Sequence, residues 1–322
     1  MFNSLAIQIV LAYILDLILG DPRWFPHPVR GIGWLIKKHE TVLRKTVSNE
    51  RVGGIILAVS VIALSWFLSF IIIRIAFYVS WYLGSFVSIF LIYSSLSARD
   101  LDVESMEVYH PLEKKDIILA RGKLSLIVGR DTHNLEYREL IRAVVETVSE
   151  NIVDGIISPL FYAFIGGAPL SMAYKAVNTL DSMVGYKNEK YKDFGWASAR
   201  IDDCVNFIPA RLSIVFLSLA AFLTGKDGLN SWRIARRDGR KNPSPNSGIS
   251  EAAVAGALEI RLGGLNFYNS VPSIKPYIGN DTNPIEIKHI KESIRISYVC
   301  STLFLISGVF LIAIIKTYYC RY

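Results

Sequence analysis

Long uncharged apolar segments alternate along the chain with loops that carry most of its basic residues. Residues 52–73 and 75–98 contain no charged side chain. Each is longer than the roughly 20 residues that a helix needs to cross the hydrocarbon core of a bilayer. Residues 296–315 follow the same pattern, and residues 2–20 do so apart from Asp16. The pattern predicts membrane-embedded helices, two of which are consecutive and form a hairpin.

Two further apolar segments are ambiguous. Residues 155–174 are uncharged but contain two prolines and a Gly166–Gly167 pair, which interrupt helices. Residues 212–225 are uncharged but too short for a straight span. A broken helix at membrane depth is tolerated where protein or a water-filled cavity covers its backbone. Both segments are therefore compatible with a span, a re-entrant hairpin or a buried helix.

The basic loops predict an orientation. A helical hairpin that turns near Arg74 or Gly84 places residues 21–51 and 99–154 on one side of the membrane, and the positive-inside rule makes that side cytoplasmic. Residues 226–295 are also basic, and they share this side if both ambiguous segments cross or if neither does. We favour the arrangement in which neither ambiguous segment crosses, because a single active site would need the polar clusters on one side of the membrane.

Composition supports a membrane protein. The chain has 322 residues, 52% hydrophobic residues and a mean hydropathy of +0.35, which is too apolar for an ordinary soluble domain. No linker or repeat divides it, so we predict a single domain over residues 1–322. We expect an all-α polytopic fold with about 4–6 membrane-embedded helices and helical cytoplasmic-side loops. The net charge of +7 lies in loops, so we expect no nucleic-acid partner.

The first apolar segment and the three cysteines each allow one further prediction. The first apolar segment lacks a basic start and a small-residue cleavage site, which favours a retained helix over a cleaved signal peptide. Three cysteines are isolated from one another in the sequence, so neither a disulfide framework nor a zinc site is expected.

The first polar cluster follows the first apolar segment. Its prolines, Pro22, Pro26 and Pro28, predict a stiff extended path. Such a loop could aim Asp21 and His27 at a site, and His27 could act as a general base near neutral pH. The alternative is an interfacial turn anchored by a tryptophan.

The second polar cluster is acidic. On a helix, Glu146, Glu150 and Asp154 share one face at four-residue spacing, where like charges repel. This row of three carboxylates therefore predicts a cation beside it, either a Lys or Arg side chain or a divalent metal. Oxygen ligands favour magnesium or calcium over zinc. The alternative is a solvated acidic face.

The third polar cluster covers residues 174–211. At helical spacing, its first half places Lys175, Asn178 and Asp181 on one face. Its second half adds Arg200, Asp202, Asp203, Asn206 and Arg211. Charged residues next to membrane segments are costly and indicate a functional site. The alternative is a structural Asp–Arg pair.

The fourth polar cluster joins a basic run to a helix of small residues, predicted from about residue 250 to 262. Ser247 or Ser250 could cap this helix, with Glu251 in its first turn. A capped helix N-terminus beside arginine and lysine favours phosphate binding, although no P-loop sequence is present. The alternative is a basic loop followed by a packing helix, since the small residues would let another helix approach closely.

Taken together, these motifs resemble those of the adenosylcobinamide-phosphate synthase family, the CobD/CbiB proteins of cobalamin biosynthesis. The resemblance covers nearly the whole chain. Its main motifs are Gly20-Asp21-Pro22, His27-Pro28-Val29, Glu150-Asn151, Asp154-Gly155, residues 174–183, Ala199-Arg200, Asp202-Asp203, Pro209-Ala210-Arg211, Ser244-Pro245-Asn246 and Leu262-Gly263-Gly264.

The resemblance implies a multi-pass enzyme of the inner (cytoplasmic) membrane. Such an enzyme joins aminopropanol, free or as its O-phosphate, to a carboxylate side chain of adenosylcobyric acid. The amide product is adenosylcobinamide phosphate, so the corrinoid is a substrate and not a cofactor. Because a carboxylate is a poor electrophile for an amine, we expect ATP and Mg²⁺ to activate it.

From this chemistry we assign roles to the polar residues. Candidate magnesium ligands are Glu150, Asp154, Asp181 and Asp202, with Asp203 as a further candidate. Candidate catalytic residues are His27, Asp181, Asp202 and Asp203. Candidate substrate-binding residues are Asp21, Lys175, Asn178, Arg200, Asn206, Arg211, Ser244, Asn246 and Ser247. A corrinoid cleft among Trp24, Tyr174, Tyr186 and Trp196 is a further hypothesis.

Two other classes of function remain open alternatives. A membrane carrier for an anionic corrinoid-pathway substrate could also place charged residues on broken helices near the bilayer midplane. A non-catalytic scaffold for corrinoid enzymes is the second. The expected partners are the lipid bilayer and the two substrates, together with a second copy of the chain or other corrinoid-pathway membrane enzymes. The active site is expected to face the cytoplasm.

Overall fold

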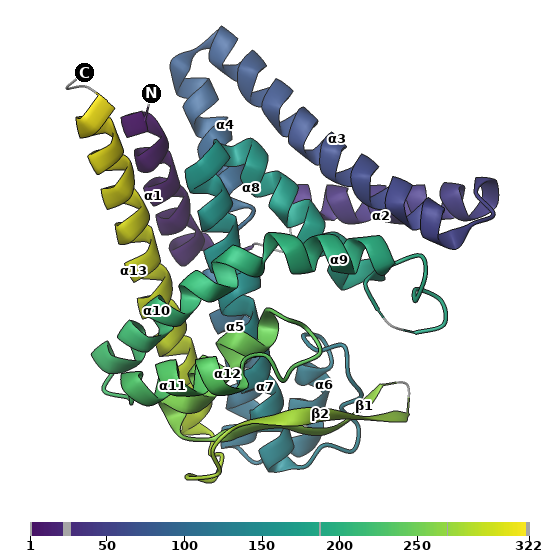
Figure 1. Cartoon of the computed structure of the whole chain (residues 1–322), viewed down its shortest axis with the longest axis vertical. Coiled ribbons are helices and arrows are strands. Elements are labelled where there is room, and N and C mark those ends of the chain that lie inside the picture. Colours follow the sequence, from purple (N-terminus) through teal and green to yellow (C-terminus); the bar gives the residue numbers. More distant parts are fainter. Residues whose placement is uncertain (1, 22–26, 187, 269, 320–322) are drawn as a thin grey trace. The chain divides into compact units, whose positions relative to one another are not determined.

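The computed structural model describes residues 2–21, 27–186, 188–268 and 270–319. Helices make up most of the regular structure, as predicted, and one two-stranded antiparallel hairpin was not expected (Figure 1). The helices are α1 (Phe2–Leu19), α2 (Pro28–Thr46), α3 (Glu50–Val79), α4 (Trp81–Tyr93), α5 (Ala98–Glu113), α6 (Ile117–Leu124), α7 (Tyr137–Asn151), η1 (Ile152–Ile157), α8 (Ser158–Val184), α9 (Trp196–Val205), α10 (Phe207–Leu223), α11 (Gly228–Asp238), α12 (Ser247–Leu258) and α13 (Lys288–Tyr319). The strands are β1 (Arg261–Tyr268) and β2 (Val271–Gly279).

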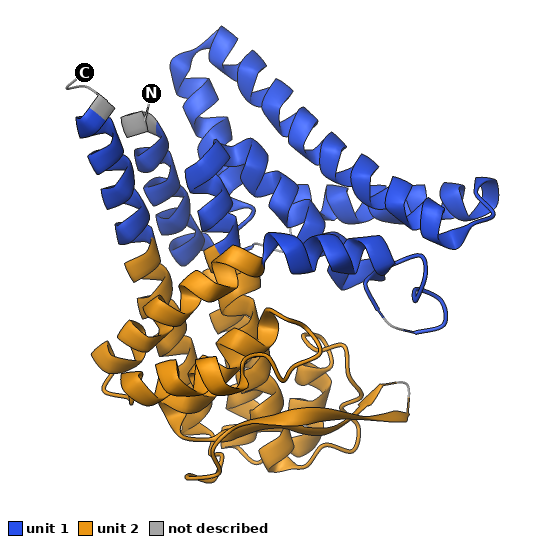
Figure 2. Cartoon of the chain, viewed as in Figure 1, with its two compact units in different colours: residues 1–97, 158–206, 305–322 blue, residues 98–157, 207–304 orange. Residues whose placement is uncertain are grey.

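The chain forms two compact units, which are described separately (Figure 2). Unit 1 contains residues 1–97, 158–206 and 305–322, and unit 2 contains residues 98–157 and 207–304. Each unit is assembled from segments that are distant in the sequence. The expectation of a single domain over residues 1–322 stays a prediction.

Four helical stretches are long and apolar enough to cross a membrane, counted over the described part of the chain. They are Glu50–Val79, Trp81–Glu113, Tyr137–Val184 and Lys288–Tyr318. A fifth arises if α9 and the following α10 form one broken span. This number agrees with the predicted range, and it confirms a polytopic membrane protein.

The predicted hairpin of two apolar helices is α3 and α4, which pack against each other (Figure 1). The turn lies at Ser80, between the two positions considered from the sequence, and its hydroxyl accepts a hydrogen bond from the Leu83 N–H at 3.1 Å. Helix α3 buries small residues such as Gly54 and Ser69 and exposes large ones such as Phe67 and Ile75. Small residues allow close helix packing while the large apolar ones face lipid.

Helix α8 reverses direction inside the ambiguous segment of residues 155–174. The Ser171 hydroxyl donates a hydrogen bond to the Pro159 carbonyl at 3.1 Å, and the rings of Tyr162 and Tyr174 stack with centroids 5.3 Å apart. Twelve residues of straight helix would separate each pair by about 18 Å. The helix therefore folds back at Gly166–Gly167, where the backbone is not helical. Among the three arrangements left open by the sequence, the local geometry is that of a hairpin.

Because α8 reverses direction here, the stability of the protein should be sensitive to substitution of Gly167. Its φ of 65° and ψ of −158° lie in a region that is essentially restricted to glycine. We expect Gly167→Ala to lower the free energy of unfolding by about 1–3 kcal/mol, because the strain acts even though the added methyl group finds ordinary contacts. Thermal unfolding of the purified protein in detergent measures this.

Gly31→Ala is the matched control for this prediction. Gly31 lies within α2, and outside its own helix a methyl group there would meet no atom of the described residues within 4 Å. An alanine in a helix is favoured over glycine by about 0.5–1 kcal/mol, so stability should hold or rise. Equal stability of the Gly167→Ala variant and the unaltered protein would contradict the assigned backbone conformation.

Unit 2 is built around α12, whose twelve residues are all buried. The small residues predicted to allow close packing do so, since Gly256 lies against α11 with no room for a side chain near the Asn230 carbonyl. The expected boundaries were wrong. The helix begins at Ser247 without a side-chain cap and ends at Leu258, and Glu259 then adopts a left-handed conformation with φ of 55°.

Asp238 fastens the end of α11 to the end of β2 within unit 2. Its carboxylate accepts hydrogen bonds from Arg237, at 2.8 and 2.7 Å, and from the Gly279 N–H at 3.0 Å, and the Lys241 ammonium lies 2.7 Å away. Burial opposes ionisation, but these hydrogen bonds dominate and lower the pKa of Asp238 to about 2.

This pKa predicts an acid-dependent contribution to stability. The folded value of about 2 lies below the ordinary value of 3.8, so the stabilisation is complete above that ordinary value and is lost as the pH falls toward 2. We expect Asp238→Asn to destabilise the protein by about 2 kcal/mol at neutral pH, the free energy that corresponds to this pKa difference, and to remove this pH dependence. Unfolding measured between pH 7 and pH 2 tests it.

Asp281→Asn is the control for the acid prediction. Asp281 pairs with Arg261 at 3.0 Å, but its side chain is 58% exposed, so its loss should cost less than about 1 kcal/mol. A larger effect of Asp281→Asn than of Asp238→Asn would show that burial does not govern these two pairs.

Candidate functional site

Asn206 joins three parts of unit 1. It is fully buried, and its side-chain oxygen accepts hydrogen bonds from the Ser158 hydroxyl at 2.6 Å and the Tyr174 hydroxyl at 2.9 Å. Its amide nitrogen donates to the Asp202 carboxylate at 3.0 Å. Ser158 and Tyr174 lie on the two arms of the α8 hairpin, whereas Asp202 lies on α9. The predicted residue Asn206 therefore fixes the position of the predicted residue Asp202.

The hydrogen bonds around Asn206 restrict how Asp202 can point. A second tyrosine, Tyr162, donates to the Val205 carbonyl at 2.9 Å and stacks on Tyr174, which holds the arms of α8 against the end of α9. Buried polar networks with satisfied partners are rigid. An aspartate held in this way is suited to orient a cation or a substrate group, because its carboxylate does not need to reorganise.

Arg200 and Asp203 lie on the same helix as Asp202 but form a different kind of pair. The Arg200 guanidinium lies 3.5 Å from the Asp203 carboxylate, and the arginine side chain is 65% exposed. Exposed pairs contribute little to stability. The alternative of a buried structural Asp–Arg pair is therefore wrong for these two residues, and Arg200 can reach a soluble ligand.

The second arm of α8 carries the other predicted residues of this cluster. Lys175, Asn178 and Asp181 are all partly buried along this arm. Asp181 lies against the following turn, where its carbonyl accepts the Gly185 N–H at 2.8 Å. Burial, together with the charge of Asp181 and of Tyr191, raises the pKa of the Tyr186 hydroxyl. Binding roles for these residues stay predictions.

Asp21 and His27 form a direct pair. The Nε2 atom of His27 lies 3.1 Å from a carboxylate oxygen of Asp21, and the imidazole side chain is only 8% exposed. A carboxylate at one ring nitrogen fixes the tautomer and orientation of an imidazole, as a general base requires. The two residues were predicted to act together, and the structure brings them together. The intervening Pro22, Pro26 and Trp24 lie outside the described residues, and with them the stiff path and one wall of the proposed corrinoid cleft.

In unit 2, Arg211 reaches the loop that precedes α12. Its guanidinium donates to the Asn246 side-chain oxygen at 2.9 Å and lies over the Phe207 ring, 3.5 Å from the centroid. The Ser244 hydroxyl accepts from the N–H groups of Asn246 and Ser247, both at 3.4 Å. These residues thus shape the helix start itself, and Ser247 does not cap it. Phosphate binding by Ser244, Asn246 and Ser247 stays a prediction.

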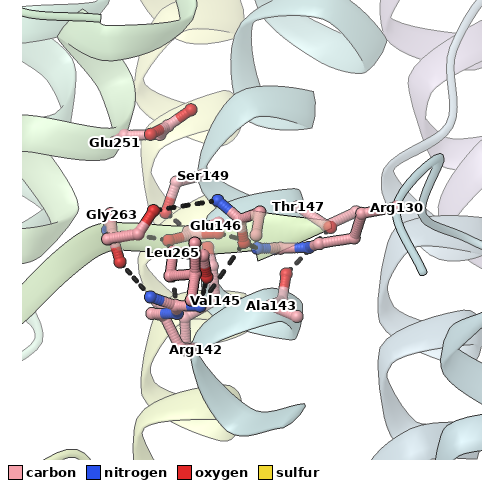
Figure 3. Close-up of polar contacts among 12 residues, drawn as sticks. Arg130, Arg142, Ala143, Val145, Glu146, Thr147, Ser149, Glu251, Gly263 and Leu265 are labelled. Atoms are coloured by element: carbon pink, nitrogen blue, oxygen red, sulfur yellow. Dashed lines mark hydrogen bonds and ion pairs between the residues drawn. The ribbon is translucent and has the colours of Figure 1, made fainter. Parts of the chain in front are cut away.

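Within the second cluster, Glu146 does not lie on a solvated face. Glu146 is 3% exposed, and its carboxylate lies 2.6 Å from the Arg130 guanidinium and 3.9 Å from that of Arg142 (Figure 3). It also accepts the Gly263 N–H at 2.8 Å. Arginine side chains therefore meet the predicted need for a cation at Glu146. Asp154 lies beyond α7 in the π-helical turn η1, which changes its register relative to Glu146.

Two arginines also bind the β-hairpin beside this cluster. Arg130 donates to the Asn266 side-chain oxygen. Arg142 donates to the carbonyls of Gly263 and of Leu265, the latter at 2.9 Å (Figure 3). Gly263 has a φ of 86° at an irregularity in the strand pairing, which a side chain would not tolerate. The Leu262-Gly263-Gly264 motif thus shapes the backbone that Glu146 and Arg142 bind.

Glu251 is a buried charged residue to which the sequence analysis assigned no role in a site. It was assigned only to a helix turn, but its side chain is 1% exposed and its Oε1 atom accepts one hydrogen bond, from Asn242 at 3.2 Å. Burial raises its pKa to about 8; Lys275 opposes this rise, while Glu150 and Glu146 add to it. A buried carboxylate shifted this far is a signal of function that only the structure could reveal.

A magnesium ion is implied by the chemistry that the resemblance suggests. Within the described ranges, no three His, Cys, Asp or Glu side chains are grouped as metal ligands. Magnesium commonly uses one or two protein carboxylates and completes its coordination with water and substrate phosphates. The hydrogen-bonded Asp202 fits that role. Glu150 and Asp154 belong to unit 2, whereas Asp181 and Asp202 belong to unit 1, and one shared ligand set stays a prediction.

Comparisons with known proteins agree over most of the chain. Residues 9–297 match the family model described as CobD/Cbib protein. The chain is 50% identical over 290 residues to the cobalamin biosynthesis protein CobD of Geobacter metallireducens, covering 90% of this chain and 91% of the relative. It is 47% identical over 296 residues to the cobalamin biosynthesis protein CbiB of Salmonella typhimurium, covering 91% and 93%.

A third relative gives the same result. The cobalamin biosynthesis protein CobD of Leptospira interrogans is 46% identical over 295 residues, which cover 92% of this chain and 94% of the relative. No solved structure matches the chain. Because both the family model and these relatives match nearly the full length, the chain belongs to the CobD/CbiB family.

Proposed function

We propose that this protein acts in cobalamin biosynthesis as an ATP-dependent amide ligase. It would join aminopropanol or its O-phosphate to a carboxylate side chain of adenosylcobyric acid. The observation that carries the proposal is the match over at least 90% of the chain to relatives named for cobalamin biosynthesis. The chemical step itself is inferred from the family resemblance and from the polar residues described above.

Amide formation from a carboxylate needs an activated acyl group, which ATP with Mg²⁺ would supply. The residues of unit 1 would serve this reaction in three ways. Asp202, held by Asn206, orients the cation or a substrate group. Arg200, which is exposed, binds an anionic group, for which a guanidinium is well suited. His27, held by Asp21, takes or shuttles a proton.

We place the protein in the cell inner membrane with its active site toward the cytoplasm. The apolar helices support a multi-pass arrangement. The basic segments of residues 21–51, 99–154 and 226–295 support the sidedness through the positive-inside rule. Cytoplasmic access also suits a reaction that consumes ATP.

The proposal is tested by product formation. Purified protein in detergent is incubated with adenosylcobyric acid, magnesium-ATP and either aminopropanol or aminopropanol phosphate, and the products are identified by mass spectrometry. We expect the amide product together with ADP, and the more effective amine identifies the donor. A folded protein that binds the corrinoid but forms no amide with either amine would overturn the ligase proposal.

A membrane carrier is the second candidate function, and the α8 hairpin favours it specifically. Carriers bind anionic substrates at discontinuous helices near the middle of the bilayer, and α8 is discontinuous at Gly166–Gly167. Reconstitution into vesicles separates the two functions. Uptake of a corrinoid without amide formation would support a carrier, whereas amide formation at the outer vesicle face without uptake would support the ligase.

A further inference from the structure

Helix α2 of unit 1 is amphipathic and exposes one of its two faces. Ile32 and Ile36 on the inner face are buried, and the helix packs against α3 and α8 of the same unit. The opposite face is exposed, and its residues recur at the spacing of a helix stripe. We call these residues the outer face of α2: Arg30, Trp34, Lys37, Lys38, Val42 and Lys45.

The outer face of α2 is strongly basic. It carries four cationic side chains, none of which forms an ion pair within 4 Å among the residues that the structure describes. The sequence of α2 contains one acidic residue, Glu40, and its side chain is 12% exposed. Glu40 instead pairs with Arg44 at 3.0 Å and with Lys190 at 3.5 Å. The outer face therefore presents positive charge to whatever covers it.

Apolar side chains lie among these cations. Trp34 is 61% exposed and Val42 is 52% exposed. The Lys38 ammonium lies 4.8 Å from the centroid of the Trp34 ring, which is a cation–π contact. Exposed tryptophan beside lysine is typical of the boundary between lipid and water, where the ring enters the apolar layer and the lysine stem extends its charge back to the surface.

The neighbouring helix α3 places this face at the edge of the membrane. Helix α3 is long and apolar enough to cross, and its uncharged run begins at residue 52. On α3, the Ser60 hydroxyl lies 3.4 Å from the Nδ1 atom of His39 on α2 (Figure 1). Ser60 is about 12 Å along the helix from the start of the uncharged run. Helix α2 therefore runs beside the first part of the membrane-crossing segment, at the level where headgroups meet hydrocarbon.

We propose that the outer face of α2 docks on anionic phospholipids. Its four basic side chains bind the phosphate groups, and Trp34 and Val42 insert among the upper parts of the acyl chains. The charge and the depth of this face both match such lipids, because basic residues next to a membrane helix attract anionic headgroups and an amphipathic helix buries its apolar side chains at the same boundary. The surface lies wholly within unit 1, and the proposal does not depend on the ligase function.

Lipid docking of α2 has a consequence for the residues just before it. His27 directly precedes Pro28, the first residue of α2, and Nε2 of His27 lies 3.1 Å from the Asp21 carboxylate. A helix held on the headgroups therefore holds the Asp21–His27 pair close to the membrane surface.

Quenching of Trp34 fluorescence by brominated lipids tests the proposal. The full-length protein is reconstituted into vesicles of phosphatidylcholine and phosphatidylglycerol, in which only one of the two lipids carries bromine on the upper part of its acyl chains. The chain has six tryptophans, so the Trp34 signal is the difference between the unaltered protein and Trp34→Phe. We expect brominated phosphatidylglycerol to quench more strongly than the same fraction of brominated phosphatidylcholine. The difference should correspond to at least about fivefold enrichment of the anionic lipid, the factor expected for one basic residue near an anionic surface.

The double variant Arg30→Gln/Lys37→Gln removes the charges one turn to either side of Trp34 and leaves the cation–π contact of its ring in place. We expect the preference for phosphatidylglycerol to fall at least about fivefold, while Trp34 remains accessible to both lipids. The matched control is Lys114→Gln/Lys115→Gln, which removes the same number of exposed charges from unit 2. This control should keep the preference of the unaltered protein.

Salt provides a second measurement that needs no charge variant. Raising the ionic strength from about 0.1 M to about 1 M shortens the screening length from about 10 Å to about 3 Å, so the preference for phosphatidylglycerol should fall while both lipids still quench.

Four results would overturn the proposal. They are equal quenching by the two lipids at low salt, a preference that persists in Arg30→Gln/Lys37→Gln, equal loss of the preference in Lys114→Gln/Lys115→Gln, and no quenching by either lipid. The last of these would show that protein covers the outer face of α2.

Discussion

Replacement of Glu146 by alanine is expected to destabilise unit 2 by about 3–5 kcal/mol, because it leaves Arg130 buried without its counter-charge. The Arg130 side chain is only 7% exposed, so water cannot replace the lost carboxylate. The Gly263 N–H also loses its acceptor. We expect a large fall in the unfolding temperature of the detergent-solubilised protein and reduced yield at growth temperature.

Glu107→Ala is the matched control for this prediction. Glu107 pairs with Lys123 at the same distance of 2.6 Å, but both side chains are more than one third exposed. An exposed pair of this kind contributes at most about 1 kcal/mol. Equal destabilisation by Glu107→Ala and Glu146→Ala would show that burial of the Arg130–Glu146 pair is not the cause.

Asn206→Ala is expected to reduce amide formation at moderate magnesium concentration by about 10–100-fold, which is the usual cost of removing a residue that orients a metal ligand. Asn206 would act through Asp202, to which it donates a hydrogen bond at 3.0 Å. Higher magnesium should partly restore the Asn206→Ala variant, whereas Asp202→Ala should remain inactive at every concentration. Initial rates of product formation against magnesium concentration measure the difference.

Two results would contradict this assignment. Full activity of Asp202→Ala would exclude Asp202 as a required cation ligand. Loss of activity in Asn206→Ala that magnesium does not relieve would indicate a role of Asn206 in folding the α8 hairpin instead of in positioning Asp202. Thermal unfolding of both variants, with Asp281→Asn as a surface control, identifies that second case.

The membrane helices could be predicted because charge-free runs are a direct consequence of burial in hydrocarbon. Residues 52–73 and 75–98 gave the α3–α4 hairpin, and its turn fell at Ser80, within a few residues of the expected positions. The prolines and glycines of residues 155–174 indicated a break but not its geometry. The direction of α8 after Gly167 depends on the contacts of Ser171 and Tyr174, which no local pattern encodes.

The candidate site was only partly predictable. Asn206 and Asp202 were identified because polar residues next to apolar segments are unusual, and the Asp21–His27 pair was identified for the same reason. The β-hairpin was not expected, since Pro272, Pro276 and consecutive glycines hide the strand pattern of residues 261–279. Without that hairpin, Lys275 had no place near Glu150, and Glu251 remained an ordinary helix-start residue.

The reversal of α8 also affects how many membrane crossings are counted, and so which side of the membrane is assigned to the segments that follow. Its second arm returns alongside the first, residues 158–165, so the two arms together do not carry the chain to the opposite leaflet. A hydropathy plot nevertheless counts this segment as a crossing and would invert the orientation of everything that follows. Reporter tags inserted just before Ser158 and just after Val184 should therefore label the same compartment.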